Sequence, residues 1–320
     1  MIKKILIIGA FGYIGARMCS FFGGKKEYFV TALGRAEPSS ECKWLNEIDE
    51  VIIGDIRDNL IIDKLLLKNF DVVINLVSLN QKGSETSPIN LSDINIMPTW
   101  NLLERLTKNN LKMFIYFSTI HVYGNLKSGL IDESYNQYPM NNYGLTHQIS
   151  EKVVDYYNSI SKTKCISLRL SNGYGSPKIL NESCWSLVLN NMCKSAYQQK
   201  KIIITSDGTP MCDFIHMDDI CSAVEVLLIN YKSFDHNVFN LCSMKSLSIS
   251  DVAILVQNFY YKRYRKKIPI QYSMKSIRNR KIEKVTDYNI DNTRLKGIGF
   301  ESSISIEDGI NELFKYFENV

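Results

Sequence analysis

The first apolar run of the chain leads directly into a glycine-rich turn: Ile5-Leu6-Ile7-Ile8-Gly9-Ala10-Phe11-Gly12-Tyr13-Ile14-Gly15. Residues 5–8 are apolar at every position, which is typical of a β-strand buried on both faces of a sheet. A helical pattern follows the glycines and continues through Phe22. A strand, a glycine turn and a helix in this order predict a site where backbone N–H groups and the helix dipole hold a pyrophosphate. Glycine is needed at the turn because a side chain there would hold the backbone away from the phosphates.

The second predicted strand, residues 28–33, bears on which dinucleotide would bind. At the end of this strand an acidic side chain would bind the 2′-hydroxyl of the adenosine ribose, as is expected for NAD. This chain has Gly34 and Arg35 there, which leave room and positive charge for a 2′-phosphate. The sequence therefore favours NADP(H) over NAD(H). A solvated surface arginine is the alternative interpretation of Arg35.

The alternation of strand and helix continues along the chain. Further strands are predicted at residues 51–54, 71–77, 113–118 and 166–170, and helices between them at residues 61–67 and 98–106. Strands that alternate with helices predict an α/β protein with a doubly wound parallel sheet, whose ligands bind beyond the carboxyl ends of the strands.

Residues 142–151 read Asn-Tyr-Gly-Leu-Thr-His-Gln-Ile-Ser-Glu and predict the start of a helix. Tyr143 and His147 are four residues apart and therefore lie on one face of that helix. A basic partner one turn after a tyrosine is a way to make a phenol ionise near neutral pH. The pair is thus a candidate for proton transfer.

Composition limits the possible functions. The chain has 320 residues, of which 45% are hydrophobic and 22% charged, so one large or two coupled globular domains are expected. A net charge of +5 is compatible with an anionic small molecule and too weak to indicate nucleic acid by itself. The eight cysteines form no C-x-x-C pair, so we predict reduced thiols and neither a disulfide framework nor a zinc site. No apolar run is long enough for a signal peptide or a membrane span, so we expect a cytoplasmic protein.

The motifs and their order resemble those of the extended short-chain dehydrogenase/reductase superfamily, specifically its nucleotide-sugar epimerase/dehydratase family, over almost the whole chain. The resemblance rests on Gly9-x-x-Gly12-x-x-Gly15, Thr119 four residues before Tyr123, Tyr143-Gly144, Asn172 in Asn-x-Tyr-Gly, and Asp213-Phe214-Ile215-His216. It implies a Rossmann-type NAD(P)-binding domain in residues 1–170, to which residues 213–242 return. It also implies a smaller C-terminal domain, mainly in residues 171–320, that binds a nucleotide-linked sugar, and a homodimer formed through helices.

The resemblance also implies roles for three residues. Thr119 would hydrogen-bond the sugar oxygen, and Tyr143 would act as the general acid/base. The family normally has a lysine four residues after the tyrosine, where this chain has His147. An unperturbed imidazole has a pKa of about 6.5 and is mostly neutral in the cytoplasm, so we predict that His147 positions the cofactor and is not a permanent cation. The alternative is that His147 only fills the space of the lysine in a weakened or redox-silent site.

The predicted site residues fall into two groups. The cofactor would be bound by Gly9, Phe11, Gly12, Tyr13, Ile14, Gly15, Gly34, Arg35, Asp55, Ile56, Leu76, Val77, Ser78, Asn95, Tyr143 and His147. The substrate would be bound by Thr119, Ile120, His121, Tyr143, Asn172 and Arg280. For His121 the alternative is that it packs beside the end of the strand. Many members of the family hold the diphosphate with an arginine where this chain has Cys212, and Arg278 or Arg280 would supply that charge here.

These predictions give a leading function and several alternatives. The leading function is an NADP(H)-dependent reductase or epimerase of a nucleotide-activated sugar, with reduction of a keto-sugar favoured. Dehydration is disfavoured, because Ile120 and His121 stand where the dehydratases have an Asp-Glu pair. The alternatives are an NAD-dependent nucleotide-sugar epimerase and a cofactor-binding protein without turnover.

Two other features of the sequence receive structural interpretations. His216, with Asp218 and Asp219 after it, is assigned to a strand-to-helix junction, and no metal site is predicted. Residues 260–267 interleave aromatics and cations, as some single-strand nucleic-acid binders do. A solvated helix end or a patch that faces a diphosphate is favoured over nucleic acid for that segment.

Overall fold

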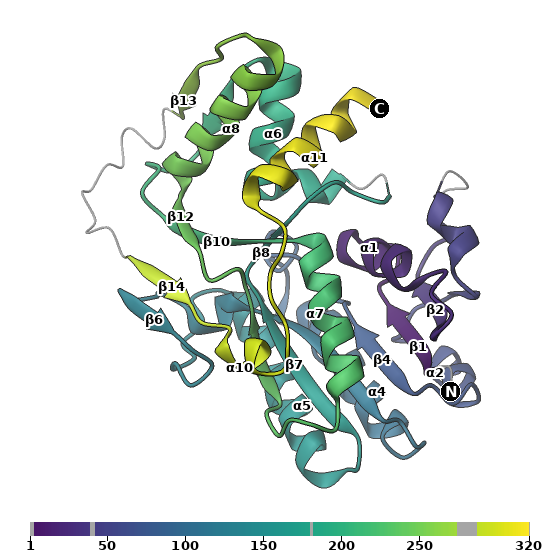
Figure 1. Cartoon of the computed structure of the whole chain (residues 1–320). Coiled ribbons are helices and arrows are strands. Elements are labelled where there is room, and N and C mark those ends of the chain that lie inside the picture. The colour runs from purple at the N-terminus through teal and green to yellow at the C-terminus, as the bar shows by residue number, and fades with distance from the viewer. Residues whose placement is uncertain (1–2, 39–41, 180–181, 274–286, 320) are drawn as a thin grey trace.

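The structure, a computed structural model, describes residues 3–38, 42–179, 182–273 and 287–319. A large parallel sheet with helices on both faces forms one end of the molecule, and three helices with short strands form the other (Figure 1).

The large sheet has seven strands in the order β11-β7-β5-β4-β1-β2-β3, and every pairing in it is parallel. This confirms the predicted α/β fold class and its parallel sheet. The strands are β1 (Lys3–Ile8), β2 (Tyr28–Gly34), β3 (Glu50–Ile53), β4 (Val72–Asn75), β5 (Met113–Thr119), β7 (Lys164–Leu170) and β11 (Val238–Leu241).

Two strands differ from their predictions for identifiable reasons. The strand predicted at residues 71–77 ends at Asn75, because the Asn75 side chain accepts a hydrogen bond from the backbone N–H of Val77 at 3.1 Å and turns the chain. Strand β11 has no counterpart among the predictions. It is only four residues long, and the buried Asn240 interrupts its apolar pattern.

Helices cover both faces of this sheet. On one face α1 (Tyr13–Phe22) and α7 (Met217–Asn230) contribute to one hydrophobic core. On the other face lie α2 (Asn59–Leu66), α4 (Met97–Leu106) and α5 (Asn142–Ile160), which contribute to a second core. Burial against the sheet follows from the apolar stripe of each helix.

A third core lies at the other end of the molecule (Figure 1). It is formed by α6 (Val188–Gln199), α8 (Ile249–Tyr264) and α11 (Ile306–Asn319), with β9 (Ile202–Ile204) and β13 (Ile270–Tyr272). A small sheet of β8 (Asn172–Tyr174), β10 (Met211–His216) and β12 (Ser246–Ser248) connects the two ends. From β10 the chain continues through α7 and returns to the large sheet as β11. The division into two domains stays a prediction.

None of the helices in the described ranges combines the length and the apolar character that crossing a membrane requires. No two of the eight cysteines are joined in a disulfide.

Candidate functional site

The glycine-rich turn between β1 and α1 brings backbone N–H groups to the carboxyl edge of the sheet. Gly9 has φ +84°, a left-handed conformation that other residues rarely adopt. The N–H groups of Gly9 and Ala10 both donate to the carbonyl of Leu33, at 3.0 Å each. A Cβ on Gly15 would lie 2.2 Å from the carbonyl oxygen of Gly9, so the helix passes too close to the turn for any side chain. No side chain caps the N-terminus of α1, and this bare cradle fits the pyrophosphate of a dinucleotide.

Residues at the ends of β2 and β3 line the side of this cradle where the adenosine of a dinucleotide would lie. Gly34 ends β2, and the ring of Phe11 fills the space beside it: a Cβ on Gly34 would lie 2.1 Å from Phe11 Cδ2. The space that the sequence leaves at position 34 is therefore occupied by the chain itself. Asp55 binds Arg57 with both carboxylate oxygens, and Ile56 is buried. An open groove of about 900 Å³ begins at these residues and continues along α4.

The loop after β4 is held against α5 by Asn95. The Asn95 side chain accepts from the N–H of Leu79 at 2.8 Å and donates to Thr146 at 2.9 Å. Leu76 and Val77 are half-buried beside Gly9. Asn95 ends the short helix α3 (Pro88–Asn95) and is fully buried, so its side chain acts on this loop in the described structure. Its predicted contact with a cofactor stays a prediction.

Thr119 and Tyr143 come together at the carboxyl end of β5. Thr119 is the last residue of β5, and its side chain hydrogen-bonds the Tyr143 phenol in the first turn of α5. Asn141 caps α5 by accepting from the N–H of Gly144 at 2.8 Å. A Cβ on Gly144 would lie 2.5 Å from the His121 carbonyl oxygen, so only glycine allows α5 to begin this close to residues 120–123. These contacts fix the Tyr143 side chain against Thr119.

His147 lies one turn after Tyr143 and is only 2% exposed. Its Nε2 is 3.0 Å from Ser78 Oγ, and its Nδ1 is 2.8 Å from the Tyr116 hydroxyl. Ser78 donates its own proton to the carbonyl of Leu79, so it accepts from His147, and the Tyr116 hydroxyl donates to Nδ1. Burial, followed by the nearby His121, lowers the pKa of His147 to about 3. The imidazole is therefore neutral at neutral pH and makes its contacts as the Nε2–H tautomer.

The described residues therefore place no cation beside the Tyr143 phenol. The rings of His147 and His121 lie 4.6 and 5.6 Å from the Tyr143 ring, both edge to face. Burial lowers the pKa of His121 as well. Burial raises the pKa of Tyr143, and the hydrogen bond with Thr119 opposes that shift only in part. The phenol is therefore protonated at neutral pH and is ready to donate a proton to an oxygen beside it.

The other predicted substrate residues lie on three different parts of the chain. Ile120 and His121 follow Thr119 directly in a short 3-10 helix, and His121 contacts Tyr143. Asn172 begins β8, and its side chain donates to the carbonyl of Asp213 at 2.9 Å. Arg280 and Arg278 lie outside the described residues. The roles assigned to all of these residues stay predictions.

The structure adds residues that the sequence interpretation did not single out. Tyr116 in β5 is the second partner of His147. Ser118 donates to Glu151 at 2.5 Å, and Glu151 receives the Arg169 guanidinium at 2.8 Å, so a buried ion pair ties β5, α5 and β7 together. A tyrosine in a strand that is buried on both faces is the signal that would have indicated Tyr116, because a buried hydroxyl needs a partner.

His216 and its acidic neighbours form an ion-pair cluster between the two ends of the molecule. His216 caps α7, and its Nε2 lies 2.8 Å from Glu312 of α11. Arg17 of α1 binds Asp218 at 2.6 Å and Glu312 at 3.1 Å. Although burial acts to raise the pKa of Glu312, His216 and Arg17 hold it well below its usual range. The guanidinium supplies the positive charge that a metal would bring, which agrees with the structural role predicted for His216.

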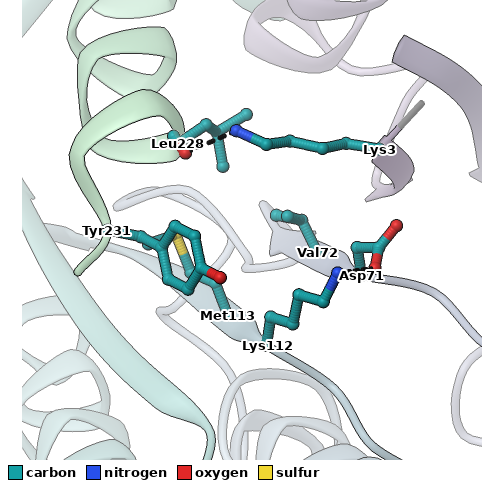
Figure 2. A pocket seen from close by; sticks show the side chains of 7 residues that line it. All are labelled: Lys3, Asp71, Val72, Lys112, Met113, Leu228 and Tyr231. Atoms are coloured by element: carbon teal, nitrogen blue, oxygen red, sulfur yellow. Dashed lines mark hydrogen bonds and ion pairs between the residues drawn. The ribbon is translucent and has the colours of Figure 1, made fainter. Parts of the chain in front are cut away.

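A small cavity at the amino-terminal edge of the sheet is a poor functional candidate. Figure 2 shows Lys3 directed at the carbonyl of Leu228 and Lys112 at Asp71, with donor–acceptor distances of 2.7 Å in both cases. The cavity holds about 40 Å³, room for little more than a water molecule. It opens where β1, β4 and β5 begin, opposite the edge where ligands of doubly wound sheets bind.

The aromatic and basic segment at residues 260–267 also takes a structural role. Tyr260 is buried against α11, and Tyr264 and Arg263 both bind Glu318 of that helix. Tyr260 and Tyr264 are therefore not free to stack on bases as a single-strand binder requires, and only Tyr261 of the three tyrosines is exposed.

Comparisons with known proteins identify the family. The family model described as the NAD dependent epimerase/dehydratase family matches residues 5–242. A UDP-glucose 4-epimerase of Rhizobium leguminosarum bv. trifolii is 27% identical over 71% of this chain and 73% of its own length. A dTDP-D-glucose 4,6-dehydratase of Dictyostelium discoideum is 27% identical over 99% of this chain and 82% of its own length. The solved UDP-glucuronic acid 4-epimerase of Bacillus cereus, in complex with NAD, has the same fold, with a TM-score of 0.80, 24% identity and 99% of each chain covered. The chain is a member of the NAD-dependent epimerase/dehydratase family.

Proposed function

We propose that this chain is an NAD-dependent epimerase that inverts a hydroxyl-bearing carbon, C4 in the first instance, of a UDP-linked hexose. The observation that carries the proposal is the hydrogen-bonded pair of Thr119 and Tyr143 at the carboxyl end of β5, on the same edge of the parallel sheet as the glycine cradle after β1. The family supports NAD, and the UDP-sugar 4-epimerases among the similar proteins support epimerisation. Together they favour this function over the NADP(H)-dependent keto-sugar reductase that the sequence alone favours.

In the proposed mechanism the residues of this chain move one proton in each direction. Tyr143 acts in this step from its ionised form, which its raised pKa makes the minor form at neutral pH. The phenolate accepts the proton of the sugar hydroxyl, and Thr119 holds the sugar oxygen by a hydrogen bond while it becomes a carbonyl. Bound NAD would supply the hydride acceptor and donor for the same carbon, so that the hydride can return to the opposite face of the sugar. Tyr143 then gives the proton back. His147 holds Ser78 and the loop after β4 in place and exchanges no proton itself, because both of its ring nitrogens are already engaged.

Reduction of a keto-sugar is the second candidate. The neutral imidazoles leave the Tyr143 phenol protonated, which is the state that donates a proton to a carbonyl. Such a reductase would use one equivalent of reduced cofactor for each sugar, whereas an epimerase consumes none.

The test follows the sugar and the cofactor separately. Purified protein with NAD⁺ and no reductant is incubated with UDP-glucose or UDP-glucuronic acid, and the 4-epimer is measured by NMR. We expect epimer to form without net NADH. Consumption of reduced cofactor with a UDP-4-keto-sugar, and no epimer, would instead support the reductase.

Two variants give the test its control. Tyr143→Phe removes the proton-transfer group, and we expect a loss of about 10²–10⁴-fold in rate. Tyr156→Phe changes a 54% exposed tyrosine of the same helix and should leave the rate unchanged. If NAD binds but Tyr143→Phe behaves like Tyr156→Phe, the enzyme proposal fails and a cofactor-binding protein without turnover is favoured.

A further inference from the structure

The end of β2 is arranged differently from the usual dinucleotide site. In the usual arrangement an acidic side chain at this place hydrogen-bonds the adenosine ribose and rejects a 2′-phosphate. Here Gly34 has no side chain, and the Phe11 ring lies where one would be, with Cδ2 and Cε2 2.1 and 2.6 Å from the position of a Cβ. Phe11 comes from the glycine turn itself, two residues after Gly9.

The Phe11 ring is held in this place from behind. Its centroid lies 6.0 Å from that of Trp44, which is only 3% exposed. The Trp44 indole N–H donates to the carbonyl of Lys178 at 3.1 Å, which anchors it to a distant part of the chain. The backbone of the turn is fixed as well, because Gly9 and Ala10 both donate to Leu33. Moving the ring would therefore disturb a packed wall.

Arg35, the residue after Gly34, has a carboxylate near it. Arg57 lowers the pKa of Asp55, which follows β3, against the opposing effect of burial, and Arg35 is close enough to lower it further. The Gly54 N–H donates to the carbonyl of Gly34 at 2.9 Å, so the ends of β2 and β3 are joined at this point. A carboxylate thus lies on the side of the cradle where a 2′-phosphate would bind, and its negative charge would repel that phosphate.

We propose that Phe11 determines the cofactor specificity of this chain: its ring covers the space for a 2′-phosphate and so selects NAD by shape, without an acidic residue. Arg35 becomes a phosphate ligand only when that ring is removed. The inference rests on the proposed use of NAD, and it replaces the preference for NADP(H) that Gly34 and Arg35 indicate in the sequence.

The test measures the dissociation constants of NAD⁺ and NADP⁺ by titration calorimetry, on protein freed of bound nucleotide. The variants are Phe11→Ala, Phe11→Leu, Arg35→Ala and the double variant Phe11→Ala/Arg35→Ala. We expect the wild type to bind NAD⁺ at least 10-fold more tightly than NADP⁺. Phe11→Ala should narrow that ratio by 10-fold or more through a gain in NADP⁺ affinity, and Phe11→Leu, which keeps an apolar side chain, should narrow it less.

Arg35→Ala distinguishes this inference from a direct role of the arginine. Arg35→Ala alone should change the affinity for NAD⁺ and for NADP⁺ by no more than about 2-fold. In the double variant it should cancel the gain in NADP⁺ affinity that Phe11→Ala produces. A wild type that prefers NADP⁺ would overturn the inference, as would a Phe11→Ala variant that weakens both nucleotides equally. Circular dichroism shows whether Phe11→Ala is folded. If it is misfolded, the two nucleotide affinities of Phe11→Leu decide the test. If the wild type binds neither nucleotide, the proposed function fails as well, whereas an unchanged ratio overturns only the role of Phe11.

Discussion

His147 lies between two hydroxyl groups in the interior of the protein, and this placement fixes both its orientation and its charge. Ser78 accepts from one ring nitrogen and Tyr116 donates to the other. Protonation would place a second N–H, on Nδ1, against the O–H group that Tyr116 donates to this nitrogen. The region is buried, so no solvent would accept the added proton's hydrogen bond. A lysine at this position has no acceptor among these partners except the two hydroxyl oxygens. The histidine therefore has a hydrogen-bond network of its own at this position.

The first prediction at this scale concerns stability as a function of pH. The pKa of His147 is about 3 in the folded protein, compared with the ordinary value of 6.5 for an exposed histidine, so the unfolded chain binds the proton first as the pH falls. The contribution to stability is complete above pH 6.5 and is lost progressively from there towards pH 3. At pH 5 the loss is about 2 kcal/mol. Chemical denaturation of the wild type and of His147→Asn at pH 8 and pH 5 measures it as the difference between the two proteins.

The exposed His236 provides the control for that measurement. His236→Gln should follow the wild type at both pH values. If His147→Asn loses as much stability as the wild type between pH 8 and pH 5, the buried imidazole is not the group that titrates.

The second prediction places a cation beside Tyr143. In His147→Lys an ammonium group would stand one turn from the phenol and favour its ionised form, so the rise of kcat with pH should move to lower pH by about 1 unit. NAD⁺ affinity should fall, because Ser78 and the loop after β4 lose their donor. Steady-state rates from pH 6 to pH 10 and a cofactor titration are the measurements. Identical pH profiles together with equal affinity would leave His147 without a particular role.

At the level of secondary-structure elements, α5 is held to the sheet by a buried ion pair two turns after Tyr143. Glu151 accepts from Ser118 at 2.5 Å, from Gln137 at 2.5 Å and from the Arg169 guanidinium at 2.8 Å. Ser118 directly precedes Thr119 in β5, and Glu151 lies two turns after Tyr143 in α5. The pair thereby connects the two elements that carry the hydrogen-bonded Thr119 and Tyr143.

The third prediction follows from the burial of that pair. Glu151→Ala leaves the Arg169 charge without its partner in the interior, and we expect the free energy of unfolding to fall by about 3–5 kcal/mol. Lys108→Ala removes an exposed ion pair with Glu104 on the adjacent helix and should leave the free energy of unfolding nearly unchanged. Urea denaturation of both variants measures the two losses. Equal small losses would mean that Glu151 is as well solvated as Glu104.

Local patterns in the sequence predict most of these elements but not their contacts. The six strands predicted in the first 170 residues are present, because uninterrupted apolar runs identify strands buried on both faces. The position of Tyr143 and Thr119 follows from motif spacing. Partners such as Tyr116 and Ser78 depend on β5 lying beside β4 in the sheet, which is information of tertiary structure. The contact of the Phe11 ring with Gly34 also depends on tertiary structure, because residues 11 and 34 meet only through the pairing of β1 and β2.

At the scale of the whole molecule, the two ends are connected by charge as well as by packing. Arg17 belongs to the helix that follows the glycine turn, and Glu312 belongs to the last helix of the chain. Their ion pair is supported by His216 and by the Ser176 backbone N–H, which donates to Glu312 at 3.0 Å. The helix next to the proposed pyrophosphate site is thus joined directly to the core formed by α6, α8 and α11.

The fourth prediction concerns assembly, and it starts from an apolar stripe on the outer face of α5. Leu145, Ile149, Tyr156 and Ile160 are exposed at helical spacing on this helix, and Met97 and Trp100 are exposed on the adjacent α4. Their spacing places the four α5 residues on one side of the helix, opposite the side that packs on the sheet. A second copy that presents the same two helices would cover the stripe in a two-fold interface, which agrees with the helix-mediated homodimer that the family resemblance implies.

Sedimentation equilibrium at micromolar concentration measures this assembly. We expect a dimer for the wild type and a monomer for Ile149→Glu, because a carboxylate in the centre of a two-fold apolar interface meets its own copy and loses its hydration. Ile254→Glu is the matched control: Ile254 is 46% exposed on α8, compared with 39% for Ile149, and its substitution should leave the dimer intact. A monomeric wild type, or a dimer that survives Ile149→Glu and dissociates with Ile254→Glu, would place the contact elsewhere. Because α5 also carries Tyr143, a monomeric variant with reduced kcat and unchanged stability would further connect assembly to the position of Tyr143.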